Sequence, residues 1–389
     1  MKKLLLSVLL LFAQQALVAQ ADILETYIQD QLEPSRIPGV AAVVFKETGI
    51  CWEGYFGMAN FETETPVSDS TIFMLASVSK TLTGTAVVQL HDQGYFELDD
   101  PINDYLPFEV KVPNYPDAPI TFRHLLNHLG GIRDNWNLIP YFPGDSPITL
   151  DTFLYHYLDP NGDDYSASQN FYNNAPPGQN YHYSNVGYTL LGYLVEVISG
   201  QPFNEYCNAN LFDPMEMYDA RWFLAETDTS RLAMPYYFAG GNFIPIGHYG
   251  YTDYPDGQLR ATARDLAHFL QMLIYDGTAE NGNAILSPAA VELMTPSDFS
   301  GGLTWFVDSP GPGYNSWEHD GGDQGVTTVI GFNPNDSIGI VILTNGEASL
   351  YAGGAGFWEA VWDHARSNFC EPPGATALEE TPDTGQLTV

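Results

Sequence analysis

The chain has 389 residues and a formal net charge of −35, with 13 Lys and Arg against 48 Asp and Glu. This excess of acid excludes nucleic acid and anionic membrane surfaces as partners, because their phosphates repel it. A hydrophobic fraction of 44% with 14% aromatics is enough for a packed core and excludes an acidic disordered chain. Because salt screens self-repulsion, we hypothesise a saline habitat and expect a melting temperature that rises towards molar salt.

Residues 1–21 are typical of a cleaved signal peptide. They begin with two lysines, continue as an apolar run, and end in small residues with an A-Q-A site. The run is too short for a membrane span, and no later stretch reaches the ~18 apolar residues that one needs. We therefore expect an exported protein, periplasmic or secreted, without membrane insertion. Cys51, Cys207 and Cys370 remain after processing. They allow one disulfide or three free thiols, and their spacing leaves the pairing open.

The first part of the mature chain predicts one helix, two strands and a second helix. A helical pattern covers Asp22 to Leu32, and G-V-A-A-V-V-F and I-C-W-E-G-Y-F-G-M-A, residues 39–45 and 50–59, read as strands around a turn. The stretch from Met74 to about Gln93 predicts a helix with Gly94 as its cap.

The remainder divides into a helix-rich middle and a strand-rich end. Helical runs at residues 120–131, 149–158, 186–200 and 261–277 are followed by β-rich runs at 302–308, 315–319, 327–334 and 337–345, and by a helix at 354–369. This order predicts an α+β fold, an α/β sandwich. One antiparallel sheet is built from the N- and C-terminal segments and flanked by helices, with an inserted all-α subdomain.

The expected boundaries follow from this division. A catalytic domain covers residues 22–370; its sheet subdomain comprises about 22–100 and 243–370, and its helical subdomain about 101–242. The acidic tail, residues 371–389, is rich in Pro, Gly and Thr, and we expect it to be disordered.

Ser77 and Lys80 form the first candidate pair. Three residues apart on a helix, they lie on one face about one turn from each other. Serine needs a base to act as a nucleophile, and a lysine desolvated in an apolar site can lose its proton near neutral pH. A solvated helix face is the alternative interpretation of this short pattern.

Two further segments carry candidate residues. Tyr183 and Asn185 lie between a Pro-Gly turn and an apolar helix, where a tyrosine near a cation can relay a proton and an asparagine can orient the lysine. A loop that is merely rich in Tyr and Asn is the alternative. His319-Asp320-Gly321-Gly322 is expected to end one strand and begin the next. Its glycines would let a substrate approach backbone N–H groups.

Other chemistries fit the sequence poorly. No serine has Gly at both −2 and +2, so the G-x-S-x-G elbow is absent. His124 and His128 stand at i and i+4 without the glutamate of a zinc helix, and D-P-N-G-D-D at residues 159–164 is better explained as a turn than as a calcium loop. We expect neither a metal nor a cofactor.

In this order, Ser77-x-x-Lys80, Tyr183-x-Asn185 and His319-x-Gly321 resemble the motifs of the serine β-lactamase and penicillin-binding protein superfamily. The resemblance spans about residues 39–369 and is closest to the class C β-lactamase-like branch, with its D-Ala-D-Ala carboxypeptidases, D-aminopeptidases and β-lactamase-like esterases.

The resemblance implies a role for each residue. Ser77 would be the acylated nucleophile, Lys80 its proton partner and Tyr183 the general acid/base. Asn185 would steady Lys80 and the substrate, and the N–H groups of Ser77 and Gly322 would form the oxyanion hole. Whether Lys80 or Tyr183 first removes the serine proton stays open.

One departure bears on the substrate. Class C β-lactamases carry Lys-Thr-Gly where this chain has His319, and a neutral imidazole binds a carboxylate less well. We therefore expect a serine esterase or D-amino-acid peptidase acting on a small-molecule or peptide substrate. The sequence leaves the oligomeric state open, with a monomer as the default. A class C-like β-lactamase and a catalytically silent penicillin-binding sensor are the alternatives. The loop from residue 161 to 181 is expected to border the cleft.

Overall fold

The computed structural model describes residues 23–46 and 49–367. The predicted signal peptide and the acidic tail lie outside these residues, as does Cys370. Within them, no helix is both long and apolar enough to span a membrane. Of the two cysteines described, Cys51 is disulfide-bonded and Cys207 is a buried free thiol.

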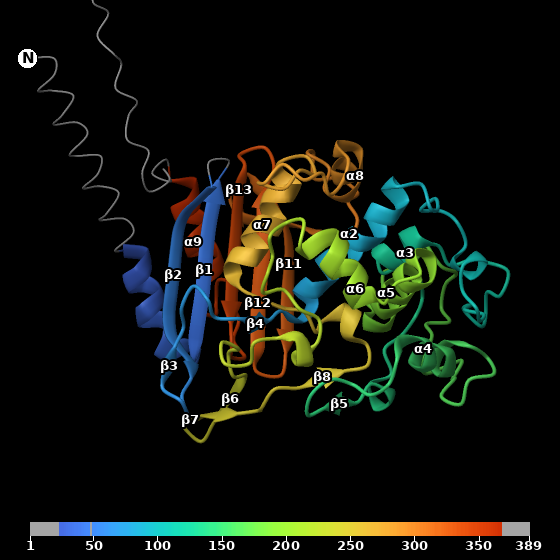
Figure 1. Ribbon diagram of the computed structural model, residues 1–389, viewed down its shortest axis with the longest axis horizontal. Helices are drawn as coiled ribbons and strands as arrows, with labels where there is room; N and C mark the ends of the chain where they lie inside the picture. The colour runs from blue at the N-terminus through green and yellow to red at the C-terminus, as the bar shows by residue number, and fades with distance from the viewer. Residues whose placement is uncertain (1–22, 47–48, 368–389) are drawn as a thin grey trace, which may run out of the picture.

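A seven-stranded antiparallel sheet forms the centre of one half of the molecule (Figure 1). β1 pairs with β13, with Val40 opposite Thr344, so the two ends of the chain meet inside one sheet. This confirms the prediction of a sheet built from both termini. The order is β10-β11-β12-β13-β1-β2-β3, with bounds Phe306–Gly311, Tyr314–Asp323, Val326–Asn333, Ile338–Thr344, Gly39–Lys46, Gly49–Asn60 and Thr65–Pro66.

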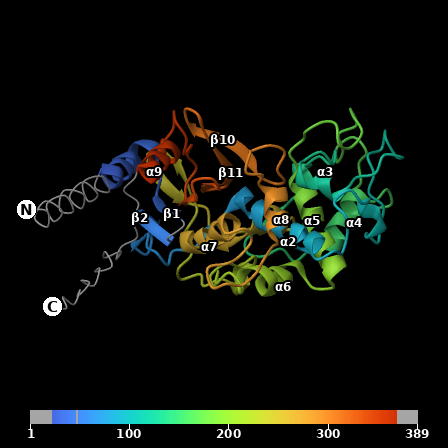
Figure 2. The same cartoon turned by 90° about the horizontal axis from the view of Figure 1, so that it is seen from above.

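Both faces of the sheet are buried at β1, which explains why this strand is apolar from Gly39 to Phe45. Alternate residues of a strand point to opposite faces. Val43 therefore packs into the large core that it shares with α7, Ala263–Ile274. Val44 packs into a second core with α9, Phe357–Arg366, and the helix at residues 23–35. In Figure 2, α9 and α7 lie on opposite sides of the strands.

The segment His319–Gly322 differs from its prediction. It was expected to join two strands, and this is wrong: β11 continues through it to Asp323, with His319 opposite Ile330 and Gly322 opposite Thr327 of β12. The turn comes later, at Gly325, whose φ of 68° lies in the left-handed region that favours glycine.

The helical half is built around two buried helices, α2 and α5, which pack against each other. Every residue of α2 from Ser79 to Leu90 is buried, so this helix is enclosed on all sides. Ser184 caps the start of α5, and Gly200 ends it in a left-handed conformation. The six helices of this half with more than one turn of α-structure span Ser79–Asp92 (α2), Phe122–Leu126 (α3), Leu150–Leu158 (α4), Asn185–Ser199 (α5), Phe203–Cys207 (α6) and Pro288–Met294 (α8).

Pairs of short strands lie outside the seven-stranded sheet. One pair places the segment before α2 against the segment before α7, another joins two distant parts of the chain, and the third is a hairpin. The pairs are β4 with β9, β5 with β8 and β6 with β7, with bounds Phe73–Met74, Arg260–Ala261, Tyr141–Phe142, Gly250–Tyr251, Tyr236–Ala239 and Asn242–Pro245.

Candidate active site

Ser77 lies on a turn that the surrounding backbone holds in place. The Leu75 N–H donates to the carbonyl of Leu259 at 2.9 Å, and Thr328 Oγ1 donates to the carbonyl of Leu75 at 2.6 Å. Ala76 has a φ of 48°, which is strained for a residue with a Cβ. Ser77 itself sits in the 3-10 turn η1, Ala76–Val78, immediately before α2, so it precedes the α-helix in which the sequence placed it.

The two glycines of β11 have different surroundings. A Cβ on Gly321 would lie 2.5 Å from the carbonyl oxygen of Leu75 and 3.0 Å from the backbone nitrogen of Ser77. Only glycine therefore lets the strand approach the Ser77 turn this closely. Gly322 is exposed, and a Cβ there would meet no atom within 4 Å. Open space beside a backbone is the property that a substrate-binding glycine needs.

Lys80 is fully buried, and its ammonium is hydrogen-bonded to Ser77 and Asp256. Its Nζ donates to Ser77 Oγ at 3.1 Å, to the backbone carbonyl of Asp256 at 2.7 Å and to Asp256 Oδ2 at 3.2 Å. Asp256 ends the 3-10 turn η6, Tyr254–Asp256. The structure thus confirms the predicted Ser77–Lys80 proximity and adds an ion pair with a residue that sequence reasoning missed.

This ion pair changes the expected charge of Lys80. Burial by itself would lower the pKa of Lys80, but the neighbouring Tyr183 and Asp256 outweigh it and raise that pKa above its ordinary value. The expectation that desolvation frees Lys80 of its proton near neutral pH is therefore wrong for the structure without substrate. Burial likewise raises the pKa of Asp256 to about 6, against the opposing effect of Lys80.

Tyr183 lies next to Lys80, as its proposed role requires. Lys80 Nζ is 5.0 Å from the centre of the Tyr183 ring. The other neighbour of this ring is the buried His128, stacked with centroids 4.2 Å apart. His128 Nδ1 also accepts the N–H of Ser184 at 3.1 Å, so one imidazole holds both the ring and the chain beside it.

Asn185 begins α5, where its backbone is held by Asp134. The Asn185 N–H donates to Asp134 Oδ2 at 2.9 Å, and the N–H of Val186 donates to Asp134 Oδ1 at 3.1 Å. Asn185 lines the same pocket as Ser77, but its side chain makes no hydrogen bond to Lys80 among the described residues. Asp256 occupies the position beside Lys80 that the sequence had assigned to Asn185.

His319 lies behind the site rather than in it. Its side chain is buried, its Nδ1 is 2.7 Å from the carbonyl oxygen of Asp320, and it does not line the pocket beside Ser77. Burial and the charge of Lys80 lower the pKa of His319 to about 3, so its imidazole is neutral. It shares a strand face with Trp317 and Gly321, which points into the large core.

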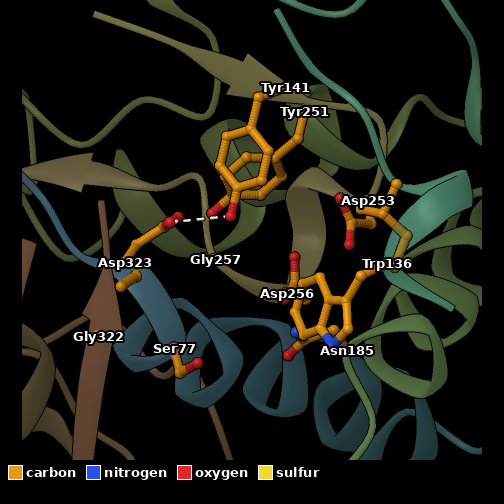
Figure 3. Close-up of a pocket in the computed structure, with 12 residues that line it drawn as sticks. Ser77, Trp136, Tyr141, Asn185, Tyr251, Asp253, Asp256, Gly257, Gly322 and Asp323 are labelled. Carbon is orange, nitrogen blue, oxygen red and sulfur yellow. Dashed lines mark hydrogen bonds between the residues drawn. The ribbon is translucent and has the colours of Figure 1, made fainter. Parts of the chain in front are cut away.

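Figure 3 shows the pocket into which Ser77 opens. Tyr141 and Tyr251 form one wall, Trp136 another, and Asp253, Asp256 and Asp323 contribute carboxyl groups. The segment at residues 136–141 thus borders the pocket, whereas residues 161–181, expected to do so, do not line it. The acids at 253 and 256 belong to T-D-Y-P-D-G, a turn pattern that carries no chemical signal of its own.

The two histidines considered for zinc have separate roles. His124 Nδ1 accepts the N–H of Thr121 in the cap of α3, while His128 contacts Tyr183 and Ser184. Among residues 23–46 and 49–367, no three or more His, Cys, Asp and Glu side chains converge as metal ligands would.

Two curated proteins are similar to this chain in sequence. Penicillin-binding protein 4 of Amycolatopsis lactamdurans is 28% identical over 336 residues, which cover 80% of this chain and 81% of that protein. Protein flp of Staphylococcus aureus (strain MW2) is 22% identical over 328 residues, covering 83% of this chain; the chain spans 62% of that longer protein.

Three solved structures share the fold. The octameric penicillin-binding protein homologue from Pyrococcus abyssi has a TM-score of 0.68 and 25% identity, over 88% of this chain and 76% of its own. EstCE1, a hydrolase with promiscuous acyltransferase activity, has a TM-score of 0.67 and 21% identity, over 91% of this chain and 99% of its own. D-amino acid amidase from Ochrobactrum anthropi SV3 has a TM-score of 0.65 and 22% identity, over 88% of this chain and 98% of its own.

The family model for Beta-lactamase matches residues 24–357, which include Ser77, Lys80 and the whole seven-stranded sheet. The chain therefore belongs to the Beta-lactamase family of β-lactamase-fold hydrolases.

Proposed function

We propose that this protein is a serine hydrolase that cleaves ester or amide substrates through an acyl-enzyme on Ser77. The observation that carries the proposal is the 3.1 Å contact between Lys80 Nζ and Ser77 Oγ. It places a fully buried cation beside a half-buried hydroxyl that opens into a pocket. A lysine is costly to bury, and a purely structural helix has no need of one here.

The proposed reaction has two halves. Ser77 Oγ attacks the substrate carbonyl and gives up its proton to Tyr183, which reacts as the phenolate beside the Lys80 ammonium, and the charge of Lys80 stabilises the negative charge that develops. The carbonyl oxygen becomes an oxyanion held by the N–H groups of Ser77 and Gly322. The leaving alcohol or amine takes the proton from Tyr183 as its bond to the carbonyl carbon breaks. Water then attacks the acyl-enzyme along the same route and releases the acid.

Tyr183 is proposed as the proton carrier because Lys80 is engaged. The ammonium of Lys80 already donates to the backbone carbonyl and to the carboxylate Oδ2 of Asp256. Burial lowers the pKa of Lys80, but Tyr183 and Asp256 raise it by more. A protonated lysine supplies positive charge but cannot accept a proton. In this scheme Asp256 keeps Lys80 charged. Asn185, which lines the pocket, binds the ester or amide group of the substrate.

An esterase or amidase is favoured over an efficient β-lactamase. The pocket beside Ser77 is lined by twelve residues, none of which is Lys, Arg or His. His319, which stands where class C β-lactamases carry the lysine of the third motif, is buried and neutral. A β-lactam carboxylate would thus find no cation other than Lys80. Similarity to EstCE1 and to a D-amino acid amidase supports the same preference.

Covalent labelling tests the nucleophile directly. We expect a fluorescent fluorophosphonate to label the wild type on Ser77 and to leave Ser77→Ala unlabelled. Ser300→Ala, which removes an exposed serine outside the pocket, is the matched control and is expected to label normally. Hydrolysis of p-nitrophenyl esters, D-amino-acid amides, D-Ala-D-Ala peptides and nitrocefin is then compared between wild type and Ser77→Ala.

The alternatives give different results in these assays. A permanent adduct with fluorescent penicillin, without turnover of any substrate, would mark a penicillin-binding sensor. Fast, Ser77-dependent hydrolysis of nitrocefin would mark a β-lactamase. Labelling that persists in Ser77→Ala would contradict the proposal itself.

Export is a separate proposal that rests on the pattern of residues 1–21. Its test is the N-terminus of the protein recovered from the periplasm or the medium. We expect a mature chain that begins at Asp22; an intact N-terminus on cytoplasmic protein would contradict export.

A further inference from the structure

The pocket beside Ser77 is strongly acidic. Asp253, Asp256 and Asp323 all line it, and no basic side chain does. Lys80 lies beneath its floor and is paired with Asp256. The pocket therefore keeps two carboxyl groups, those of Asp253 and Asp323, for which the pocket wall itself provides no cation.

Asp256 has a buried Oδ1 without a hydrogen-bond partner among the described residues but is paired with Lys80, so the buried carboxyl group that lacks a cation is that of Asp253. Its side chain is almost fully buried, with 2% of the residue exposed, and its Oδ1 has no hydrogen-bond partner among the described residues. Figure 3 shows its carboxyl group turned into the pocket, opposite Asp323. A buried polar atom without a partner is costly, so such an atom in a binding pocket indicates a missing ligand.

The charges around Asp253 indicate the kind of ligand. Burial and the nearby carboxylates of Asp256 and Asp134 raise the pKa of Asp253 well above its ordinary value, and the charge of Lys80 offsets this only partly. The ionised form of this carboxyl group is therefore disfavoured by its surroundings. A cationic ligand would supply the positive charge that stabilises it.

The aromatic wall suits the same ligand. Trp136, Tyr141 and Tyr251 surround the pocket, and the Tyr141 hydroxyl donates to Asp323 Oδ1 at 2.9 Å. Aromatic faces attract cations, most of all where water is excluded. Carboxylates on two sides and rings on a third are an arrangement that binds an ammonium group and repels an anion.

We propose that the substrate carries a primary ammonium group close to its scissile ester or amide bond, and that Asp253, assisted by Asp323, binds this group. The inference rests on the proposed function, because it assumes that Ser77 attacks that bond. It makes Asp253 a specificity-determining residue. It also predicts that N-acylated and carboxylate-bearing analogues of a good substrate react poorly.

A matched set of p-nitroanilides tests the charge preference. Both enantiomers of alanine p-nitroanilide carry an ammonium group, isobutyryl p-nitroanilide replaces it with a methyl group of similar size, and succinyl p-nitroanilide carries an anion. We expect kcat/KM for the better alanine enantiomer to exceed that for the isobutyryl compound by about 10- to 100-fold. The succinyl compound is expected to be the slowest.

Single-residue variants identify which side chains cause the preference for an ammonium-bearing substrate. Asp253→Asn and Asp323→Asn preserve size and remove a charge, and each is expected to reduce the ratio of alanine to isobutyryl rates, Asp253→Asn by about tenfold or more. Glu25→Gln is the matched control. It removes one charge from the exposed side of the helix on the other face of the sheet and is expected to leave the ratio unchanged.

A binding measurement separates this inference from the proposed function. Calorimetric titration of Ser77→Ala with alaninamide, isobutyramide and succinamate needs no catalysis, and we expect alaninamide to bind most tightly. Equal binding of the three, or a rate ratio near one in a wild type that hydrolyses all of them through Ser77, would overturn the inference alone. Absence of any Ser77-dependent hydrolysis, with selective alaninamide binding retained, would overturn the proposed function alone. An ammonium preference that survives in Asp253→Asn would remove Asp253 from the proposal.

Discussion

The ammonium of Lys80 lies 2.7 Å from the backbone carbonyl oxygen of Asp256 and 3.2 Å from its carboxylate Oδ2, although the two residues are 176 positions apart in the chain. Both side chains are buried, at 0% and 7% exposure. The pair joins the helix that follows Ser77 to the turn that lines the pocket. Stability and charge state at the site therefore depend on the same contact.

The first prediction concerns the stability of this pair. Asp256→Asn removes the negative partner of a fully buried lysine, and we expect the free energy of unfolding to fall by about 3–5 kcal/mol, because an uncompensated charge is left behind. Urea unfolding followed by circular dichroism measures it. The double variant Lys80→Met/Asp256→Asn is expected to lose less stability than the two single variants added together. Simple additivity would show that the two side chains do not interact.

The second prediction concerns the pH dependence of the reaction. Burial raises the pKa of Asp256 to about 6, so below that pH it becomes neutral and no longer favours the charged form of Lys80, on which the proposed mechanism depends. We expect kcat/KM for a neutral ester to fall as the pH drops through about 6. His319 is not expected to contribute, because burial holds its pKa at about 3.

Two variants identify the group that titrates. The acid limb of the profile is expected to persist in His319→Gln and to be lost, together with much of the activity, in Asp256→Asn. A limb that disappears in His319→Gln would assign the titration to the imidazole instead.

The third prediction contrasts the two glycines of β11. Gly321→Ala places a Cβ 2.5 Å from the Leu75 carbonyl and 3.0 Å from the Ser77 nitrogen, so the Ser77 turn must shift. Because a displacement of about 1 Å can cost 10²-fold in rate, we expect kcat/KM to fall by about that factor. Gly322→Ala meets no atom within 4 Å and is expected to change stability by less than about 0.5 kcal/mol. Its effect should appear in KM and grow with substrate size; equal losses in both variants would refute the distinction.

The fourth prediction concerns Glu318, on the opposite face of β11 from His319. Glu318 is buried at 9% exposure and hydrogen-bonded to Tyr351; burial raises its pKa from an ordinary 4.5 to about 7. Between these values the folded protein holds a proton that the unfolded chain has lost. Stability due to this group is therefore present below pH 4.5 and is lost as the pH rises through about 7.

Glu318→Gln removes that titration. The difference between the ordinary pKa of 4.5 and the raised pKa of about 7 corresponds to at most about 3 kcal/mol in the free energy of unfolding. We expect the variant to gain stability relative to wild type, by up to that amount, as the pH rises from 4.5 to 7.5. Urea midpoints across this range measure the difference. A difference that does not change with pH would show that Glu318 ionises normally.

Much of the fold could be predicted because its signals are local. The apolar run of β1 and the period of α7 appear within a few residues, and strand-rich ends around a helical middle leave few ways to form one sheet. The sequence predicts a strand junction at Gly321 and Gly322, but β11 runs through both residues. Neither has the left-handed φ that Gly325 has, and the close approach of the Ser77 turn explains the first of them.

The sequence by itself indicated which residues could react: Ser77 and Lys80 through their spacing of three residues, and Tyr183 and Asn185 through the family resemblance of their motif. Tertiary structure alone decided the charge of Lys80 and the character of the pocket. Asp253, Asp256 and Asp323 come from one turn and a strand end that approach Ser77 only after the chain has folded. Because the pKa of a buried group depends on burial and on charges within a few ångströms, no pattern along the chain could reveal it.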